Sequence, residues 1–211
     1  MARKKANYPL LEGLEITTLA AEGKAMGRWQ DVVVFVPMTV PGDVVDVQIR
    51  TKRRRYMEGY VVRYVRRSPL RVEPFCEHFG VCGGCKWQNL PYEEQLRQKQ
   101  AQVRDQLVRI GKIELPEIAP CLGSARTQFY RNKLEFTFAD RRWLTREEVA
   151  AGGDITAGPA VGFHIPNMFD KVLDIGKCWL QDDPSNAIRL EAKRFCLEHG
   201  YTFHNARTHT G

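Results

Sequence analysis

Three closely spaced cysteines constrain this chain more than any other feature. Cys76, Cys82 and Cys85 follow the spacing C-x5-C-x2-C, with Gly83 and Gly84 between the last two. Thiols bunched on a glycine-containing loop are typical of a site for zinc or for an iron–sulfur cluster. Glycine allows a sharp turn that brings backbone N–H groups close to sulfur. Because three thiolates leave one metal position open, we expect a fourth cysteine ligand from elsewhere in the chain.

The six cysteines are expected to be thiols rather than disulfides. The basic start, residues 1–5, is not followed by an apolar segment, so it does not read as a secretory signal. No apolar run approaches the ~20 residues that a membrane-spanning helix needs. We therefore expect a cytoplasmic, monomeric protein that contacts no membrane, in a compartment where clustered cysteines are more often ligands than disulfides.

Positive charge is concentrated in one segment. Residues 50–71 hold nine Arg or Lys and one acid, Glu58, a local net of +8 in a chain whose formal charge is +7. A basic stripe of this kind suits a nucleic acid partner, and the alternative is a solvated basic face. The candidate phosphate contacts are Lys52, Arg53, Arg54, Arg55, Arg63, Arg66 and Arg67.

Residues 1–68 are predicted to form a small OB-like β-barrel. Val-, Ile- and Tyr-rich strands are expected at 14–19, 32–36, 44–50 and 56–65, with turns at 23–27 and 37–42. This spacing favours a barrel of the kind that binds oligonucleotides. Alternation in the last strand places Tyr56, Tyr60 and Tyr64 on one face, either stacking bases beside arginines or forming barrel core.

Residues 69–211 are predicted to form a mixed α/β domain, so the fold class is α+β. A helix is expected over 91–110, with an apolar stripe that packs the cysteine loop against the next sheet. Strands are expected at 131–138, 160–165 and 171–175, and Thr145-x-x-Glu148 predicts the start of a short helix. A last helix begins after Asp183-Pro184. Its inner face is expected to hold Ile188, Ala192, Phe195 and His199.

The first of these domains resembles the TRAM domain, an RNA-binding β-barrel found on RNA-modifying enzymes. The resemblance rests on EGKAMGR at 22–28, VFVP at 34–37 and PGD at 41–43. It implies that residues 1–68 contact RNA.

Further motifs resemble the iron–sulfur-containing RNA uracil-5-methyltransferases, bacterial enzymes that methylate uridines of 23S ribosomal RNA. The motifs are CGGCKWQ at 82–88, Tyr92 to Lys99, YRNK at 130–133, and VGF at 161–163 leading to Cys178. The resemblance implies a [4Fe–4S] cluster in an iron–sulfur loop of the central domain. The implied ligands are Cys76, Cys82, Cys85 and Cys178.

Two alternatives stay open at this site. Cys121 is the rival fourth ligand, although a cysteine between Pro120 and Leu122 is more often a small buried hydrophobe, as Cys196 is expected to be. Zinc is the alternative metal, because four thiolates suit both. Arg131 and Lys133, on the expected central strand, form a second set of candidate RNA contacts.

The family continues into a Rossmann-type C-terminal domain that binds S-adenosylmethionine and carries the nucleophilic cysteine and the general base. No strand, glycine-rich loop and helix fingerprint of this kind appears in the sequence. We therefore expect neither catalytic nor S-adenosylmethionine-binding residues here. The chain is interpreted as the RNA-recognition and iron–sulfur portion of a parent methyltransferase, inactive by itself. The alternative is a stand-alone RNA-binding [4Fe–4S] or zinc module, and electron transfer would leave the basic stripe unexplained.

Overall fold

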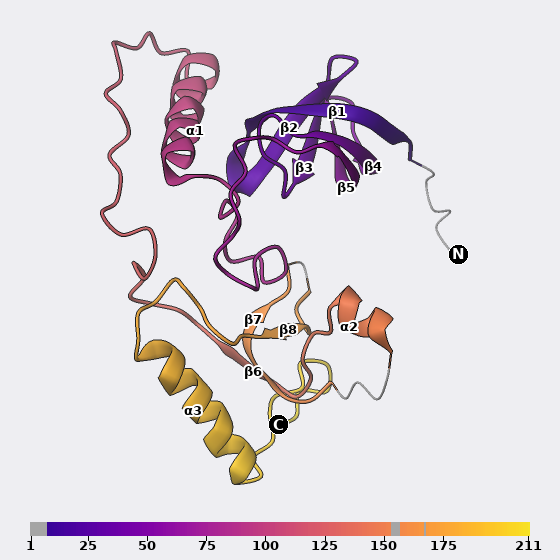
Figure 1. Ribbon diagram of the computed structural model, residues 1–211, viewed down its shortest axis with the longest axis vertical. Coiled ribbons are helices and arrows are strands. Elements are labelled where there is room, and N and C mark those ends of the chain that lie inside the picture. The colour runs from indigo at the N-terminus through magenta and orange to yellow at the C-terminus, as the bar shows by residue number, and fades with distance from the viewer. Residues whose placement is uncertain (1–7, 153–156, 167) are drawn as a thin grey trace. The chain divides into compact units, whose positions relative to one another are not determined.

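The computed structural model describes residues 8–152, 157–166 and 168–211, so the basic residues 1–5 lie outside the described residues. The chain forms two compact units (Figure 1). The barrel unit is Met1–Pro74 with Lys86–Gly123, and the cysteine unit is Phe75–Cys85 with Ser124–Gly211. This division differs from the expected boundary between residues 68 and 69, because the chain enters the cysteine unit, leaves it and returns.

Five strands close the barrel in the order β1-β2-β3-β5-β4. They are β1 Leu10–Leu19, β2 Lys24–Trp29, β3 Val32–Pro37, β4 Val44–Lys52 and β5 Tyr56–Arg66, with the 3-10 turn η1 at Ala21–Gly23. β3 and β5 pair in parallel, and the other pairs are antiparallel. The interior holds Leu14, Ile16, Val34, Val36, Val45, Val47 and Ile49. The predicted OB-like barrel is confirmed.

Strand β2 was not predicted. Its two flanking glycines indicated a turn at 23–27, and that interpretation is wrong, since Lys24–Trp29 pairs with both β1 and β3. At Gly27 a β-carbon would lie 2.1 Å from the backbone oxygen of Glu15. This glycine therefore marks the close approach of two strands rather than a turn.

The tyrosines of β5 do not share one face. Val61 opposes Val47 and Arg63 opposes Asp46, which leaves Val62 as an extra residue in a β-bulge. A bulge reverses the alternation beyond it. Tyr64 consequently packs against the barrel core, whereas Tyr56 and Tyr60 lie on the face opposite the buried Met57 and Gly59.

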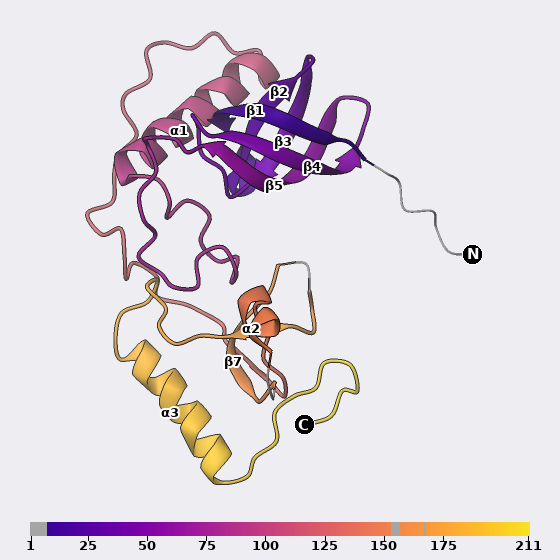
Figure 2. The same ribbon diagram turned by 45° about the vertical axis from the view of Figure 1, so that its right-hand side comes forward.

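Helix α1, Tyr92–Asp105, continues as the π-helical turn η2, Gln106–Ile110, and confirms the predicted helix. It belongs to the barrel unit and contacts β1 there (Figure 2), whereas it was expected to pack the cysteine loop against the next sheet. Gln98 accepts a hydrogen bond from the Leu19 N–H at 3.4 Å, and Gln102 donates to the carbonyls of Leu19 and Ala20 at 3.3 and 3.4 Å.

The predicted apolar stripe of this helix is wrong. Val103 is 51% exposed and Ile110 78%, while Glu94 is buried and accepts a hydrogen bond from Gln98 at 2.7 Å. The end of β1 presents backbone groups that need hydrogen-bonding partners, so a polar face of the helix docks there. Arg97 pairs with Glu94 rather than with Glu93.

The cysteine unit contains the antiparallel sheet β6-β7-β8, made of Thr137–Ala139, Ala160–His164 and Val172–Asp174. The expected strand at 131–138 forms a ladder only from Thr137. Helix α2, Arg146–Ala151, has the predicted capping box between Thr145 and Glu148. Helix α3, Ser185–Glu198, contacts β7. No helix of the described residues combines the length and apolarity needed to cross a bilayer.

The inner face of α3 is also different from the predicted one. Asn186 and Arg189 are buried, whereas Ile188 is 65% exposed and Phe195 46%. The buried pair bonds the backbone that leads into Cys178, so hydrogen bonding rather than apolar content selects this face.

Candidate metal centre and nucleic-acid interface

The structure brings the four predicted ligands together in the cysteine unit. Burial is the main reason that the pKa of the Cys76 thiol is raised, and the His78 N–H opposes that rise. Three neighbouring thiols raise the pKa further, those of Cys82, Cys85 and Cys178. Cys178 itself is buried and follows strand β8. Residues 76–85 and Cys178 thus form one site from two distant segments of the sequence.

Backbone N–H groups point at these sulfurs, as the glycine-rich loop predicted. Gly84 N donates to Cys82 Sγ at 3.4 Å. Burial raises the pKa of Cys178, and the N–H groups of Leu180 and Gln181 act to lower it. Hydrogen bonds of this kind stabilise a thiolate, the form that binds metal.

Gly83 is the glycine that shapes the loop. Its φ is +70°, and a β-carbon there would lie 2.2 Å from Cγ of Pro166. Any residue with a side chain is therefore disfavoured at position 83, both by the backbone conformation and by the lack of space.

An apolar shell surrounds the site. Cys178 and Cys82 pack with Val81, Leu134, Phe136, Phe163 and Leu180. Phe75 contacts Trp179 edge to face with ring centroids 5.6 Å apart. Trp87, although it closely follows Cys85 in the sequence, packs against the barrel core, because the chain has returned to the barrel unit at Lys86.

The arrangement of the four thiols bears on which kind of metal group they could hold. Within the described ranges, no group of three or more His, Cys, Asp or Glu side chains is arranged to hold one metal ion. The ligands of one zinc ion converge on a point, whereas the thiolates of a cubane each bind a different iron and lie farther apart. The thiols of Cys82, Cys85 and Cys178 neighbour that of Cys76, and within the described residues the four do not converge on a single-ion site.

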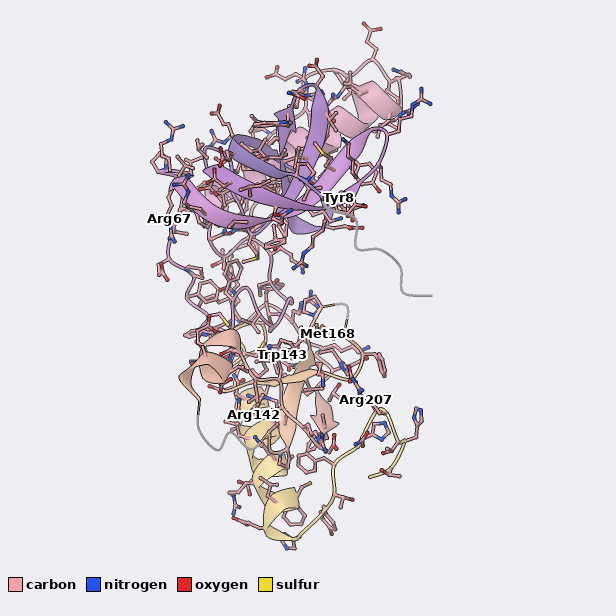
Figure 3. The ribbon with its side chains drawn as sticks, turned by 90° about the vertical axis from the view of Figure 1, so that its right-hand side faces the viewer. Tyr8, Arg67, Arg142, Trp143, Met168 and Arg207 are labelled. Atoms are coloured by element: carbon pink, nitrogen blue, oxygen red, sulfur yellow. The ribbon has the colours of Figure 1, made fainter. Side chains whose placement is uncertain are left out.

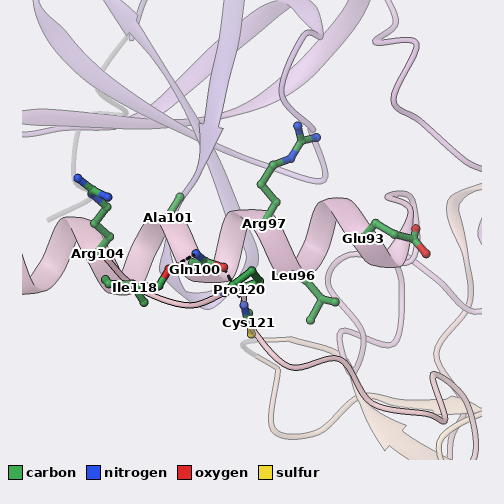
Figure 4. Close-up of a pocket in the computed structure, with 9 residues that line it drawn as sticks. All are labelled: Glu93, Leu96, Arg97, Gln100, Ala101, Arg104, Ile118, Pro120 and Cys121. Atoms are coloured by element: carbon green, nitrogen blue, oxygen red, sulfur yellow. Dashed lines mark hydrogen bonds between the residues drawn. The ribbon is translucent and has the colours of Figure 1, made fainter. Parts of the chain in front are cut away.

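Cys121 lies outside this site and is exposed, so the expectation of a small buried residue is wrong. It belongs to the barrel unit, where its N–H donates to Gln100 Oε1 at 2.8 Å. Figure 4 shows Gln100 between Cys121 and Ile118 in a groove of about 460 Å³ beside α1. The segment after η2 is held here by its backbone hydrogen bond to Gln100, so the Cys121 thiol is left at the surface. Cys196 is half-buried on α3.

All seven predicted phosphate contacts of the basic stripe are exposed, but they form two groups. Arg53, Arg54 and Arg55 form the β4–β5 turn together with Lys52 at the end of β4, and Arg63, Arg66 and Arg67 lie at the far end of β5. A strand of this length separates its ends by about 30 Å, at roughly 3.3 Å per residue. Figure 3 shows Arg67 projecting from the barrel edge.

The second group is partly engaged within the barrel. Arg63 Nε donates to Asp46 at 2.7 Å, and the Arg67 guanidinium lies 5.0 Å from the centre of the Tyr64 ring. No hydrogen bond to an acidic side chain is found for Lys52, Arg53, Arg54 or Arg55 among the described contacts. The turn group is therefore the better phosphate-contact candidate.

Arg50 was not among the predicted contacts. Its guanidinium stacks on the Tyr60 ring with a separation of 4.2 Å. Tyr60 opposes Gln48 across the β4–β5 hairpin, so Arg50 is its diagonal neighbour, a position that only the strand register reveals. Arg71 has a different role, because it donates to both oxygens of the buried Asp43 at 2.8 and 2.7 Å.

Arg131 and Lys133 are exposed in the segment before β6 rather than on a strand. The Arg131 N–H donates to the Leu180 carbonyl at 2.8 Å, which fixes its backbone beside the Cys178 segment. Lys133 pairs with Glu135 at 2.7 Å, and this carboxylate raises the pKa of Lys133. Of the two, Arg131 has its charge less compensated.

Comparison with known proteins agrees with the barrel. Residues 14–62 match the TRAM domain. A Bacteroides thetaiotaomicron protein named as an uncharacterized RNA methyltransferase is 60% identical over 193 residues, which cover 92% of this chain and 42% of that protein. The chain is a TRAM-containing relative of RNA methyltransferases. A similarly named Porphyromonas gingivalis protein is 51% identical over 94% of this chain and 44% of its own length.

Two further proteins similar to this chain have more specific names. The 23S rRNA (uracil(1939)-C(5))-methyltransferase RlmD of Francisella tularensis subsp. novicida is 37% identical over 63% of this chain and 30% of its own length. The crystal structure of Pyrococcus abyssi tRNA (uracil-54, C5)-methyltransferase, in complex with S-adenosyl-L-homocysteine, has the same fold. Its TM-score is 0.57 at 23% identity, over 94% of this chain and 40% of that one. The chain spans less than half the length of these relatives.

Proposed function

We propose that this chain is the RNA-recognition portion of an S-adenosylmethionine-dependent RNA uracil-5-methyltransferase, with 23S ribosomal RNA as its substrate. The observation that carries the proposal is the TRAM match at residues 14–62 within a chain 60% identical to a named RNA methyltransferase. The two named uracil methyltransferases among its relatives support uracil as the target base.

RNA recognition is assigned to the outer face of the barrel. Lys52, Arg53, Arg54 and Arg55 would neutralise backbone phosphates, which supply most of the sequence-independent affinity. Tyr60, with Arg50 on its ring, would offer a planar surface for an unpaired base. Arg131 would add a contact from the cysteine unit.

The proposed metal group is a [4Fe–4S] cluster held by Cys76, Cys82, Cys85 and Cys178. Support comes from the four neighbouring thiols, the N–H donors to sulfur and the apolar shell. When bound, such a cluster cross-links the loop to the Cys178 segment and relieves the repulsion between thiolates. Zinc is the competing outcome.

The S-adenosylmethionine site is proposed to lie outside this chain, because no cofactor loop follows a strand here. Isothermal titration of the 211-residue chain with S-adenosylmethionine is expected to give no heat of binding. Tight binding would require a cofactor site within the barrel or cysteine unit.

Fluorescence anisotropy with a single-stranded, uridine-containing 23S ribosomal RNA fragment tests RNA recognition directly. Each phosphate contact on a single strand contributes about −0.7 to the slope of log K against log salt, so affinity is expected to fall steeply with salt. Affinity that is weak and insensitive to salt would contradict the proposal.

A further inference from the structure

Arg189 of α3 is a buried cation whose hydrogen bonds go to neutral oxygens. It is 4% exposed, and its guanidinium donates to the carbonyls of Val161, Ile175 and Gly176, the last at 2.8 Å. Among the described residues, no carboxylate lies within salt-bridge distance of it. Asp174 is the acidic residue whose charge acts on Arg189, and its carboxylate already forms a salt bridge with Lys193 at 2.5 Å. A buried charge in this position needs a nearby negative charge to be stable.

One donor of Arg189 is unsatisfied. Its Nε is buried and has no hydrogen-bond partner among the described atoms. A charged N–H that is buried without an acceptor is destabilising. The guanidinium lies 5.1 Å from the Phe136 ring, which belongs to the apolar shell around Cys178 and Cys82. Besides Asp174, the group near Arg189 that can carry negative charge is the Cys178 sulfur, two residues beyond the Gly176 carbonyl that Arg189 bonds.

Asn186, one helical turn before Arg189, clamps the backbone of Cys178 from both sides. The Cys178 N–H donates to Asn186 Oδ1 at 2.9 Å, and Asn186 Nδ2 donates to the Cys178 carbonyl at 3.0 Å. The preceding Gly176 N–H donates to Nε2 of His78, in the cysteine loop, at 3.0 Å. The segment from Ile175 to Cys178 is therefore held by α3 on one side and by the loop on the other.

We propose that Arg189 and Asn186 are positioning residues of the cysteine site, where Asn186 orients Cys178 and Arg189 supplies the positive charge that balances the thiolates. The inference rests on the proposed cluster and extends it to α3. A four-thiolate cluster carries net negative charge, and positive charge with N–H donors near its sulfurs stabilises the bound and the reduced forms. This also explains why α3 buries a polar face and exposes Ile188 and Phe195.

The test compares Arg189→Met, Arg189→Lys and Asn186→Ala in the 211-residue chain, reconstituted anaerobically with iron and sulfide. Arg194→Met is the matched control, because it removes an arginine from the exposed side of the same helix, where Arg194 pairs with Glu191 and Glu198. The readouts are iron and sulfide per chain, the bleaching rate of the cluster in air, the midpoint potential, and circular dichroism as a check on folding.

Arg189→Met is expected to bleach about tenfold faster than wild type and to have a lower midpoint potential, because a positive charge favours reduction. Arg189→Lys keeps the charge and should keep the potential, but it loses the multiple carbonyl contacts and should bleach faster. Asn186→Ala should lose iron content without shifting the potential of the remaining cluster. Arg194→Met should match wild type.

The inference alone is overturned if wild type takes up the cluster while Arg189→Met or Arg189→Lys, folded, shows wild-type content, decay and potential. It is also overturned if Arg189→Lys shifts the potential as far as Arg189→Met. If wild type takes up no iron and sulfide, the cluster itself is rejected, and the inference is rejected with it.

Discussion

The barrel unit and the cysteine unit are built in different ways. The barrel strands are six to eleven residues long and enclose a continuous apolar core. The sheet of the cysteine unit has strands of three, five and three residues, and most buried apolar residues of the unit fall into two small clusters. Short strands bury little apolar surface, so such a unit needs an additional cross-link. The barrel can be stable by itself, while the cysteine unit depends on polar clamps and on the proposed metal.

The largest effect expected from this comparison is at Cys178. Cys178→Ala should abolish cluster binding and lower the thermal stability of the cysteine unit, leaving the melting of the barrel unchanged. Metal analysis with differential scanning calorimetry measures both. Cys121→Ala is the control and should keep the cluster, since Cys121 lies in the barrel unit. The opposite result would make Cys121 the fourth ligand.

The next effect distinguishes the two groups of the basic stripe. Replacing Arg53, Arg54 and Arg55 by Ala should reduce the salt slope of RNA binding by up to about two units, at roughly 0.7 per lost contact. Replacing Arg97 and Arg104 on α1 and Arg109 on η2 by Ala removes the same charge from the same unit. If both triple variants lower the slope equally, net charge rather than the β4–β5 turn binds RNA.

Tyr60 and Tyr64 allow a smaller test within one strand. Tyr64→Ala should destabilise the barrel by about 3 kcal/mol, the usual cost of truncating a large core side chain, with little effect on RNA binding by the folded protein. Tyr60→Ala should weaken RNA binding and change stability little, because its ring lies outside. Urea unfolding and fluorescence anisotropy on both variants measure these effects. Loss of stability in Tyr60→Ala together with loss of RNA binding in Tyr64→Ala would reverse the two assignments.

The smallest expected effect is the pH dependence due to Asp46. The Gly13 N–H and, next, Arg63 hold the pKa of this carboxyl below its usual range. A lowered folded-state pKa contributes stability above the unfolded pKa of about 3.9, and this contribution is lost as pH falls through the lower folded value. The melting temperature should therefore fall less below about pH 4 in Asp46→Asn than in wild type. Equal falls would show that other carboxyls dominate.

Much of the barrel was predictable, since four of its strands follow from residue type and turn spacing. β2 was missed because a glycine can mark either a turn or a close approach between two strands. Only the position of the partner strand shows that Gly27 permits close contact with Glu15. The bulge at Val62 likewise depends on pairing with β4. It moved Tyr64 into the core, which alternation along one strand could not indicate.

What the sequence alone determined was the cysteine spacing, the helix positions, the capping box at Thr145 and the exposed basic stripe. Tertiary structure alone decided which helix faces are buried, because α1 and α3 dock through Gln98, Gln102, Asn186 and Arg189 onto backbone groups that no pattern of apolar residues reveals. It also separated the basic stripe into two groups and left Cys121 at the surface. Helix periodicity identifies an apolar face. The face that becomes buried, however, is the one whose side chains complement the surface it packs on. Here that surface presents backbone N–H and C=O groups that need hydrogen-bond partners, so a polar face is buried.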